Sequence, residues 1–166
     1  MSVSFLPRLM TRSLTELTPD YLHQRNIRLL MLDFDNTIVP YTTDTPTPEM
    51  DAWLRRMLAS DIQLCVVSNS KSERVPVFCE KYAMDCILRS KKPFPKGIRS
   101  CMERYQIPAD ACALAGDQIF TDTLGANCAG LTSILVKPID NHTIWLKLRH
   151  VAEQPFIVLA RKRRLP

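Results

Sequence analysis

Short apolar runs alternate along this chain with helix-length segments whose apolar residues recur on one side. This alternation is typical of repeated strand–helix–strand units, which build a parallel sheet. Apolar runs that end in polar or turn-forming residues predict five strands, at residues 27–34, 62–68, 86–88, 111–115 and 133–136. We therefore expect an α/β fold with a doubly wound, Rossmann-like parallel sheet of about five strands.

Two triplets of threonine, proline and an acidic residue predict helix starts: T-P-D at residues 18–20 and T-P-E at residues 47–49. Threonine caps the helix, proline fits its first turn and the acid suits the helix dipole. The first helix is expected to end near Asn26, so that residues 1–26 wrap the sheet, and the second near Ala59. Further helices are predicted at residues 73–82, 96–105, 121–129 and 143–152.

Length and composition are those of one globular domain, with 166 residues, 46% hydrophobic and 23% charged. We expect a single domain with an N-terminal wrap (1–26), a core (27–136) and a basic C-terminal helix and tail (137–166). No apolar run approaches the roughly 20 residues that cross a bilayer, and no secretory signal is recognisable, so a cytoplasmic location is expected. The six cysteines form no C-x-x-C pair and are predicted to be reduced core thiols.

The positive charge lies at the C-terminal end. Residues 1–136 carry 15 basic and 15 acidic residues, whereas residues 137–166 carry seven basic and two acidic ones, so the net charge of +5 resides there. Any attraction to an anionic membrane or to nucleic acid is therefore expected from the tail, and a solvated basic terminus is the simpler alternative.

Polar side chains directly follow four of the five predicted strands, and parallel strands bring their carboxyl ends to one edge of a sheet. Asp33 and Asp35, two positions apart, are predicted to leave the first strand on one side and to converge on one cation. The other three strand ends supply hydroxyl and amide groups, ammonium groups and further carboxylates: Ser68, Asn69 and Ser70; Lys91 and Lys92; Asp117, Thr121 and Asp122. These groups provide Mg²⁺ ligands, a carboxylate nucleophile, a proton carrier and donors for a phosphoryl group. The set predicts a phosphoryl-transfer site.

Four segments resemble the motifs of the haloacid dehalogenase (HAD) superfamily, over about residues 28–136. They are D-F-D-N-T (33–37), V-V-S-N-S (66–70), K-K-P (91–93) and G-D-Q-I-F-T-D (116–122). The resemblance implies a Mg²⁺-dependent phosphatase in which Asp33 is the nucleophile and a metal ligand. It implies that Asp35 is the general acid and base, with its backbone carbonyl on the metal. Asp117 would be the third protein ligand and Asp122 a supporting carboxylate.

The same resemblance assigns the phosphoryl oxygens to Thr37, Ser68, Asn69 and Lys92. Lys91 is the competing lysine, and Lys92 is preferred because it directly precedes the proline. Ion-pumping ATPases of the superfamily have threonine at the place of Asp35 and keep a longer-lived phosphoenzyme, so the aspartate favours a hydrolase.

Neither slot that holds a cap domain in many HAD relatives has room for one here, because residues 38–46 are few and residues 68–92 are needed for a helix and a strand. This is the pattern of the third, capless subclass (IIIA). An open site favours bulky or surface-bound substrates. F-L-P (5–7), L-T-P (17–19) and the run 27–37 resemble the YqeG-type family, which is related to mitochondrial-type phosphatidylglycerophosphate phosphatases, and this likeness implies a lipid phosphate as substrate.

Two interpretations of the C-terminal segment stay open. Residues 143–152 place five apolar side chains on one helical face: Ile144, Trp145, Leu148, Val151 and Ala152. This face either packs on the sheet or lies on an anionic bilayer, and both hold if the membrane meets only the basic cluster of Arg161, Lys162, Arg163 and Arg164.

Three other functions compete with a lipid phosphatase. The first is a phosphatase of a soluble metabolite or phosphoprotein. The second is a phosphoacceptor domain of the receiver type, which predicts its acceptor aspartate after a middle strand and its lysine after the last, unlike the order here. The third is a non-catalytic module that binds through the tail. Nucleic acid is not an expected partner, because charge is balanced over residues 1–136 and no basic surface is interleaved with aromatic residues.

Overall fold

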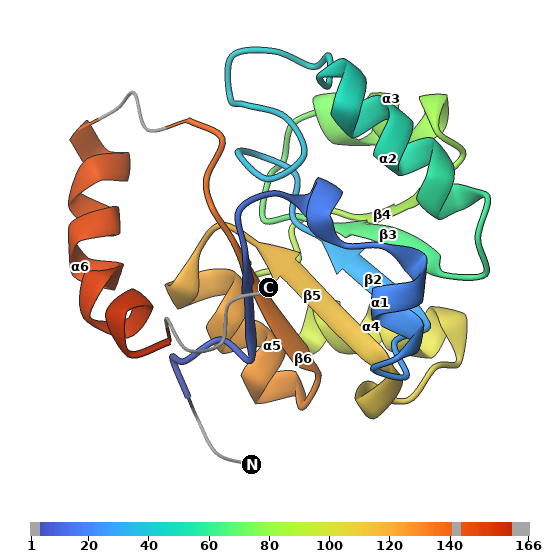
Figure 1. Ribbon diagram of the computed structural model, residues 1–166. Coiled ribbons are helices and arrows are strands. Elements are labelled where there is room, and N and C mark those ends of the chain that lie inside the picture. The colour runs from blue at the N-terminus through green and yellow to red at the C-terminus, as the bar shows by residue number, and fades with distance from the viewer. Residues whose placement is uncertain (1–3, 141–143, 161–166) are drawn as a thin grey trace.

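Six parallel strands form one sheet in the order β1-β6-β5-β2-β3-β4 (Figure 1). The computed structural model describes residues 4–140 and 144–160, with side chains of the last helix from residue 151 onward. The strands are β1 (Leu9–Thr11), β2 (Leu29–Leu32), β3 (Gln63–Val67), β4 (Asp85–Ile87), β5 (Cys112–Gly116) and β6 (Thr132–Val136). The expected doubly wound parallel sheet is confirmed, and the five expected strands all occur.

The additional strand, β1, is an edge strand within the N-terminal wrap. Among the described strands it pairs with β6 alone, where Leu9 lies beside Ile134 and Thr11 beside Val136. Its three residues are too short a run to give a pattern of their own, and their extended shape depends on pairing with residues more than 120 positions away. The sequence thus predicted five of the six strands, in keeping with the expected sheet of about five.

Helices cover both faces of the sheet (Figure 1). They are α1 (Pro19–His23), α2 (Pro48–Leu58), α3 (Arg74–Lys81), α4 (Lys96–Tyr105), α5 (Leu124–Ala129) and α6 (Ile144–Ala160). Both predicted threonine caps form, since the hydroxyl oxygen of Thr18 accepts from the Tyr21 backbone N–H and that of Thr47 from Met50 N–H. Helix α5 begins later than predicted because a π-helical turn, Ile119–Thr123, precedes it.

Successive side chains of each strand point to opposite faces of the sheet, and each face packs in its own apolar layer. Leu30 and Leu32 face one layer, where α2 and α3 pack, and the indole N–H of the buried Trp53 donates to the Leu17 carbonyl oxygen at 2.6 Å, which fixes the N-terminal segment there. Leu29 and Met31 face the other layer, where α4 and α5 pack. Continuous apolar runs in the central strands follow from this burial on both faces.

Helix α6 extends eight residues beyond its predicted end at Ala152 and contains Pro155. A proline in a helix removes one backbone hydrogen bond, but here the residues after it are held by packing. Phe156, Ile157 and Ala160 pack with Phe5 and Leu135, among others. Among the described residues, no helix is long and apolar enough to cross a membrane.

The direction in which successive strands are added to the sheet reverses beside β2. The chain runs from β2 outward through β3 to β4 and then returns to β5, which pairs with β2 on its other side. The crevice between the carboxyl ends of two such strands is where ligands bind in open α/β sheets. Asp33 follows β2 and Asp117 follows β5, so the fold places both carboxylates at this crevice.

Candidate active site

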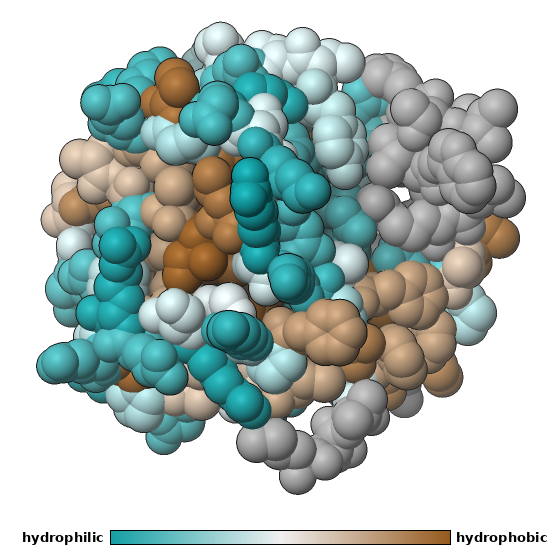
Figure 2. Space-filling view, turned by 180° about the vertical axis from the view of Figure 1, so that it is seen from behind, coloured by the Kyte–Doolittle hydropathy of each residue, from teal (hydrophilic) through white to brown (hydrophobic). Residues whose placement is uncertain are grey.

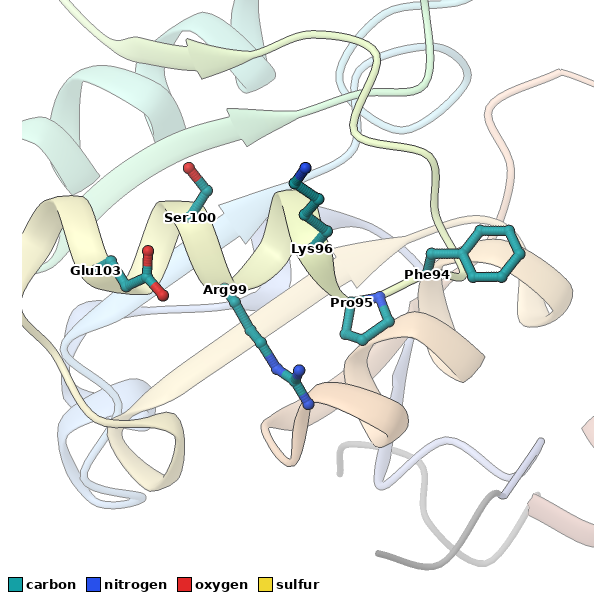
Figure 3. Close-up of a pocket in the computed structure, with 6 residues that line it drawn as sticks. All are labelled: Phe94, Pro95, Lys96, Arg99, Ser100 and Glu103. Carbon is teal, nitrogen blue, oxygen red and sulfur yellow. The ribbon is translucent and has the colours of Figure 1, made fainter.

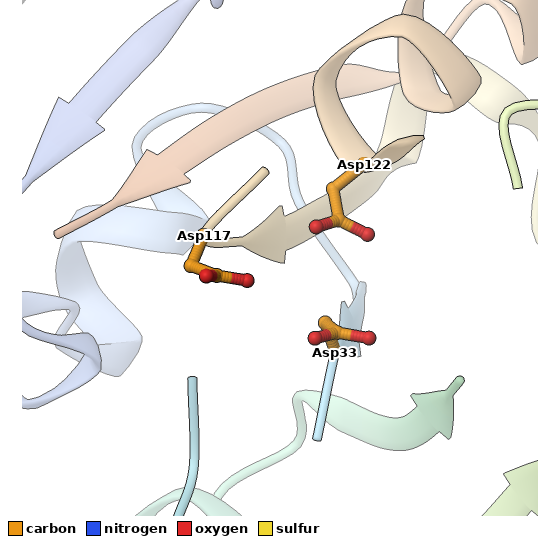
Figure 4. Close-up of side chains that lie close together, drawn as sticks. All are labelled: Asp33, Asp117 and Asp122. Carbon is orange, nitrogen blue, oxygen red and sulfur yellow. The ribbon is translucent and has the colours of Figure 1, made fainter. Parts of the chain in front are cut away.

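Three buried carboxylates meet at the carboxyl edge of the sheet. Oxygen atoms of Asp33, Asp117 and Asp122 lie within 4.8 Å of one another, and each residue is at most 6% exposed. Figure 4 shows the three carboxyl groups pointing toward one another from the end of β2, the end of β5 and the following helical turn. Three carboxylates that share so small a volume suit a hard divalent cation such as Mg²⁺.

Lys92 supplies the positive charge that this cluster needs. Its Nζ atom lies 2.7 Å from Asp33 Oδ1 and 2.8 Å from Asp122 Oδ1, and it donates to the Val67 carbonyl oxygen at 2.5 Å. The neighbouring Lys91 is exposed. The geometry thus brings Lys92, the preferred lysine, into the site and leaves Lys91 on the surface.

The charges within the site shift its pKa values. Burial raises the pKa of Asp33; the nearby Lys92 ammonium opposes this rise, whereas the Asp122 carboxylate adds to it. Burial would lower the pKa of Lys92, but the carboxylates of Asp122 and Asp33 outweigh that effect and raise it. Three buried carboxylates with one ammonium group leave an excess of negative charge, so the residues present fit a bound cation.

Asp122 reaches this cluster because of the local backbone. The π-helical turn Ile119–Thr123 directs its side chain back toward β5, and its Oδ2 atom accepts from the Gln118 backbone N–H at 3.1 Å. A Cβ atom at Gly116 would lie 2.3 Å from Asp122 Cγ, so only glycine leaves room for this close approach. The sequence predicted a supporting carboxylate, and the structure places it as close to the cluster as the other two.

Ser68 and Asn69 lie after β3. Ser68 is buried, and its hydroxyl oxygen accepts from the Ser70 backbone N–H at 3.0 Å. Asn69 is bound to the loop that carries the lysine: its Oδ1 accepts from Lys92 N–H at 2.7 Å and from the Ser90 hydroxyl, and its amide donates to the Lys92 carbonyl oxygen. The side chain of Asn69 therefore orders the lysine loop, and its predicted contact with phosphate stays a prediction.

The second motif carboxylate, Asp35, lies outside the cluster. Its Oδ1 atom pairs with Arg74 Nη1 at 3.2 Å, and its side chain is 19% exposed. Burial raises the pKa of Asp35, and Arg74 partly offsets the rise. The expected convergence of both motif carboxylates on one cation is thus not seen for the side chains, since the Asp35 carboxylate pairs with Arg74 and the cluster consists of Asp33, Asp117 and Asp122. Coordination by the Asp35 carbonyl oxygen stays a prediction.

Thr37 completes the set of predicted residues. It is buried, and its hydroxyl has no hydrogen-bond partner among the described residues. A buried hydroxyl without a partner costs folding free energy, and a bound phosphoryl oxygen would remove that cost. The contact between Thr37 and a phosphoryl oxygen stays a prediction.

Sequence patterns missed three residues that organise the site. Arg74 binds Asp35; Asn36 exchanges two hydrogen bonds with the backbone of Asp140; and buried Glu153 on α6 accepts from Ile119 N–H at 2.8 Å. A sequence signal was available for Arg74. A cation in the first turn of a predicted helix interacts unfavourably with the helix dipole, which indicates that another contact holds it there. The other two contacts join segments far apart in the chain and leave no local signal.

A surface hollow lies along the first turns of α4, lined by Phe94, Pro95, Lys96, Arg99, Ser100 and Glu103 (Figure 3). None of the clustered carboxylates lines it. Its Phe94 side chain is largely exposed and follows the lysine loop. The hollow is therefore a neighbour of the carboxylate site and not part of it.

Solved phosphatases share this fold. The deoxy-D-mannose-octulosonate 8-phosphate phosphatase of Haemophilus influenzae, solved in a cobalt-bound form, matches with a TM-score of 0.56 at 15% identity, over 84% of this chain and 92% of that chain. A putative 3-deoxy-D-manno-octulosonate 8-phosphate phosphatase from Vibrio cholerae gives 0.57 at 13% identity, over 87% and 91%. This likeness concerns the fold, and residues 90–158 also match the HAD-hydrolase-like family model. Fold and site together define the class as HAD-type hydrolases.

A sequence relative narrows the class. The probable phosphatase YqeG of Bacillus subtilis is 32% identical over 135 residues, which cover 81% of this chain and 78% of that protein. The chain belongs to the YqeG family of HAD-type phosphatases. The resemblance drawn from the four motifs is confirmed, and so is the prediction that the protein is a phosphatase. Within the described residues no cap domain occurs, since residues 38–47 form a loop and residues 68–92 are used by α3 and β4.

Proposed function

We propose that the chain is one phosphatase domain that hydrolyses phosphomonoesters with Mg²⁺ through an aspartyl-phosphate on Asp33. The observation that carries the proposal is the buried cluster of Asp33, Asp117 and Asp122 around the ammonium group of Lys92. When bound, Mg²⁺ would be held by these carboxylates and would neutralise charge on the phosphoryl oxygens.

In the first step the Asp33 carboxylate attacks phosphorus, and the bond to the ester oxygen breaks. Asp35 gives its proton to that leaving oxygen, so the alcohol departs neutral and the phosphoryl group stays on Asp33. Lys92 and the donors of Thr37 and Ser68 hold the phosphoryl oxygens. In the second step water attacks the phosphorus of the acyl phosphate, and Asp35, now a carboxylate, takes a proton from that water. The bond between phosphorus and the Asp33 oxygen breaks, so that phosphate leaves and the Asp33 carboxylate is restored.

We place the substrate among lipid or other bulky phosphates, such as phosphatidylglycerophosphate. The reason is the uncapped edge of the sheet at the carboxyl ends of the strands. Exposed apolar side chains lie there on the loops after β2, β4 and β6: Tyr41, Phe94 and Ile139. Apolar groups around an uncapped site suit a substrate with an apolar part. The competing substrate is a soluble metabolite, as the names of the Haemophilus and Vibrio phosphatases state for those proteins, or a phosphoprotein.

Magnesium removal and a substrate panel test this proposal. We expect the purified chain to hydrolyse phosphatidylglycerophosphate in mixed micelles with Mg²⁺, and to lose nearly all turnover when EDTA removes the ion, because the phosphoryl and carboxylate charges then repel. The release of inorganic phosphate is measured against sugar phosphates, nucleotides and phosphopeptides. Full turnover in EDTA would contradict the metal dependence, and preference for a soluble substrate would contradict the lipid.

A peripheral contact with an anionic membrane, at the inner face of the membrane of a cytoplasmic protein, is part of the proposal. In the described part of α6 one face packs inward, and Val151, Val158 and Leu159 are exposed on the other. In the view from behind, hydrophobic groups gather on the side of the molecule where α6 lies (Figure 2). The basic cluster of residues 161–164 follows directly in the sequence and lies outside the described residues, as do the side chains of Ile144, Trp145 and Leu148.

Changing Arg161, Lys162, Arg163 and Arg164 to Gln is expected to weaken binding to anionic vesicles at low salt by more than about tenfold, since each cation near such a surface contributes about 1 kcal/mol. Hydrolysis of a soluble aryl phosphate is expected to stay unchanged. Vesicle co-sedimentation measures the binding. The control changes four exposed arginines elsewhere to Gln: Arg55, Arg56, Arg99 and Arg104. An equal loss in both variants would assign the binding to net charge alone and remove the tail from the proposal.

A further inference from the structure

Arg74 uses every donor of its side chain at the edge of the site. The residue begins α3, immediately after the loop that follows β3, and its guanidinium group lies 5.7 Å from the ring centre of Phe34. Nη1 donates to Asp35 Oδ1 at 3.2 Å and Nε donates to the Asp44 carboxylate. An arginine side chain has five N–H donors in a fixed planar fork. Two of them thus bind carboxylates.

The other three donors bind backbone carbonyl oxygens of the loop after β2. They reach Pro40 at 3.3 Å, Tyr41 at 3.2 Å and Thr43 at 2.6 Å. All five acceptors belong to residues 35–44, so a single side chain from α3 binds both Asp35 and the loop 40–44. This segment occupies one of the positions where many relatives carry a cap domain.

The position of Arg74 links the loop to the proposed proton carrier. A cation in the first turn of a helix opposes the helix dipole, so this residue type is not favoured there by the helix itself. The Arg74 side chain is also three-quarters shielded from water, and one of its donors is bound to the carboxylate of Asp35. That carboxylate is the proposed proton carrier, and a proton carrier must be held within hydrogen-bond reach of the leaving oxygen.

We propose that Arg74 is a positioning residue of the phosphatase reaction, acting through Asp35 and through the loop 40–44. By binding Oδ1 of Asp35 it fixes the rotation of the carboxyl group and leaves Oδ2 to carry the proton to the leaving oxygen. By binding the loop 40–44 it also fixes the surface that the leaving group would contact. The inference rests on the proposed function, because it assigns Arg74 a part in the proton transfer of that mechanism.

The test compares leaving groups. Proton transfer matters most when the leaving oxygen is basic, as in an alkyl phosphate, and little when it is acidic, as in 2,4-dinitrophenyl phosphate. We expect Arg74→Ala to lower kcat for glycerol phosphate by about 100-fold, the lower range for general acid catalysis, and for 2,4-dinitrophenyl phosphate by less than about fivefold. The loss is expected in kcat more than in KM. Arg74→Lys is expected to restore part of it, and guanidinium ion added to Arg74→Ala another part.

Two further variants separate the contacts of Arg74. Asp44→Asn weakens the loop contact and keeps the bond between Arg74 and Asp35, so its loss for the alkyl phosphate is expected to be much smaller than that of Arg74→Ala. Arg55→Ala removes an exposed arginine that pairs with Asp51 and is expected to change neither rate. Circular dichroism and thermal unfolding report folding, and if Arg74→Ala does not fold, Arg74→Gln and Arg74→Lys carry the comparison.

The outcomes are distinct. Equal losses for both leaving groups in folded Arg74 variants, or no loss at all, would overturn the positioning role while leaving the phosphatase proposal intact. A wild-type chain without Mg²⁺-dependent turnover, or an Asp33→Asn variant with normal turnover, would overturn the proposed function and this inference with it.

Discussion

Replacing Asp33 by asparagine is expected to abolish phosphatase activity while leaving the fold intact. An amide cannot attack phosphorus, and loss of a nucleophile that acts in concert with its neighbours lowers turnover by at least about 10⁴-fold. The fold should survive because the new side chain keeps an oxygen that can accept from Lys92, as Asp33 Oδ1 does at 2.7 Å. The change also removes one of three crowded negative charges, so the free energy of unfolding should stay equal or increase.

Two measurements check this result. Steady-state hydrolysis of 4-nitrophenyl phosphate with Mg²⁺ gives turnover, and acid quenching with labelled substrate detects the phosphoenzyme, which we expect in the wild type and not in Asp33→Asn. The matched control is Asp61→Asn, where a 79% exposed side chain pairs with His23 on the surface. Normal turnover in Asp33→Asn would sink the covalent mechanism, whatever its stability.

Sequence patterns predicted the central sheet because its strands are long apolar runs buried on both faces, and they predicted the place of the site because parallel strands end at one edge. The rule that parallel strands end at one edge was enough to predict that Asp33 and Asp117 lie in the site. The caps at Thr18 and Thr47 were equally accessible, because a cap depends on residues three positions apart. Local periodicity therefore predicted the class of fold, and the polar residues at the strand ends predicted the class of chemistry.

What escaped the sequence depends on contacts between distant segments. Strand β1 is extended because β6 lies beside it, and α6 continues through Pro155 because Phe156 and Ile157 find an apolar partner surface. The Asp35 carboxylate binds Arg74, which is 39 positions away. No local pattern encodes such pairings, so tertiary packing decided them.

Replacing Lys92 by methionine is expected to destabilise the protein and to stop turnover. Methionine keeps an unbranched side chain of similar length but leaves Asp33 and Asp122 buried without a cation. Removing one partner of a buried ion pair costs about 3–5 kcal/mol in the free energy of unfolding. The matched control is Lys96→Met at an exposed position on α4, for which no loss is expected.

The loss should depend on pH in a definite direction. Burial and Asp122 already raise the pKa of Asp33 in the folded state, and without Lys92 that pKa rises further. A carboxyl group whose pKa is higher folded than unfolded favours the folded state while it is protonated, and this contribution is lost as pH rises through the folded pKa. The stability deficit of Lys92→Met relative to wild type is therefore expected to be small near about pH 4 and large near about pH 8.

Urea unfolding at the two pH values, with and without millimolar Mg²⁺, measures this deficit. A divalent cation that binds only the folded cluster stabilises it by mass action, so Mg²⁺ should recover part of the stability at the higher pH without restoring turnover. Recovery of stability without turnover would separate the two proposed tasks of Lys92. Mg²⁺ would then replace its charge in the carboxylate cluster but not the ammonium donor that we propose for the phosphoryl group. A deficit that is equal at both pH values would instead mean that Lys92 supports the fold by packing and not by charge.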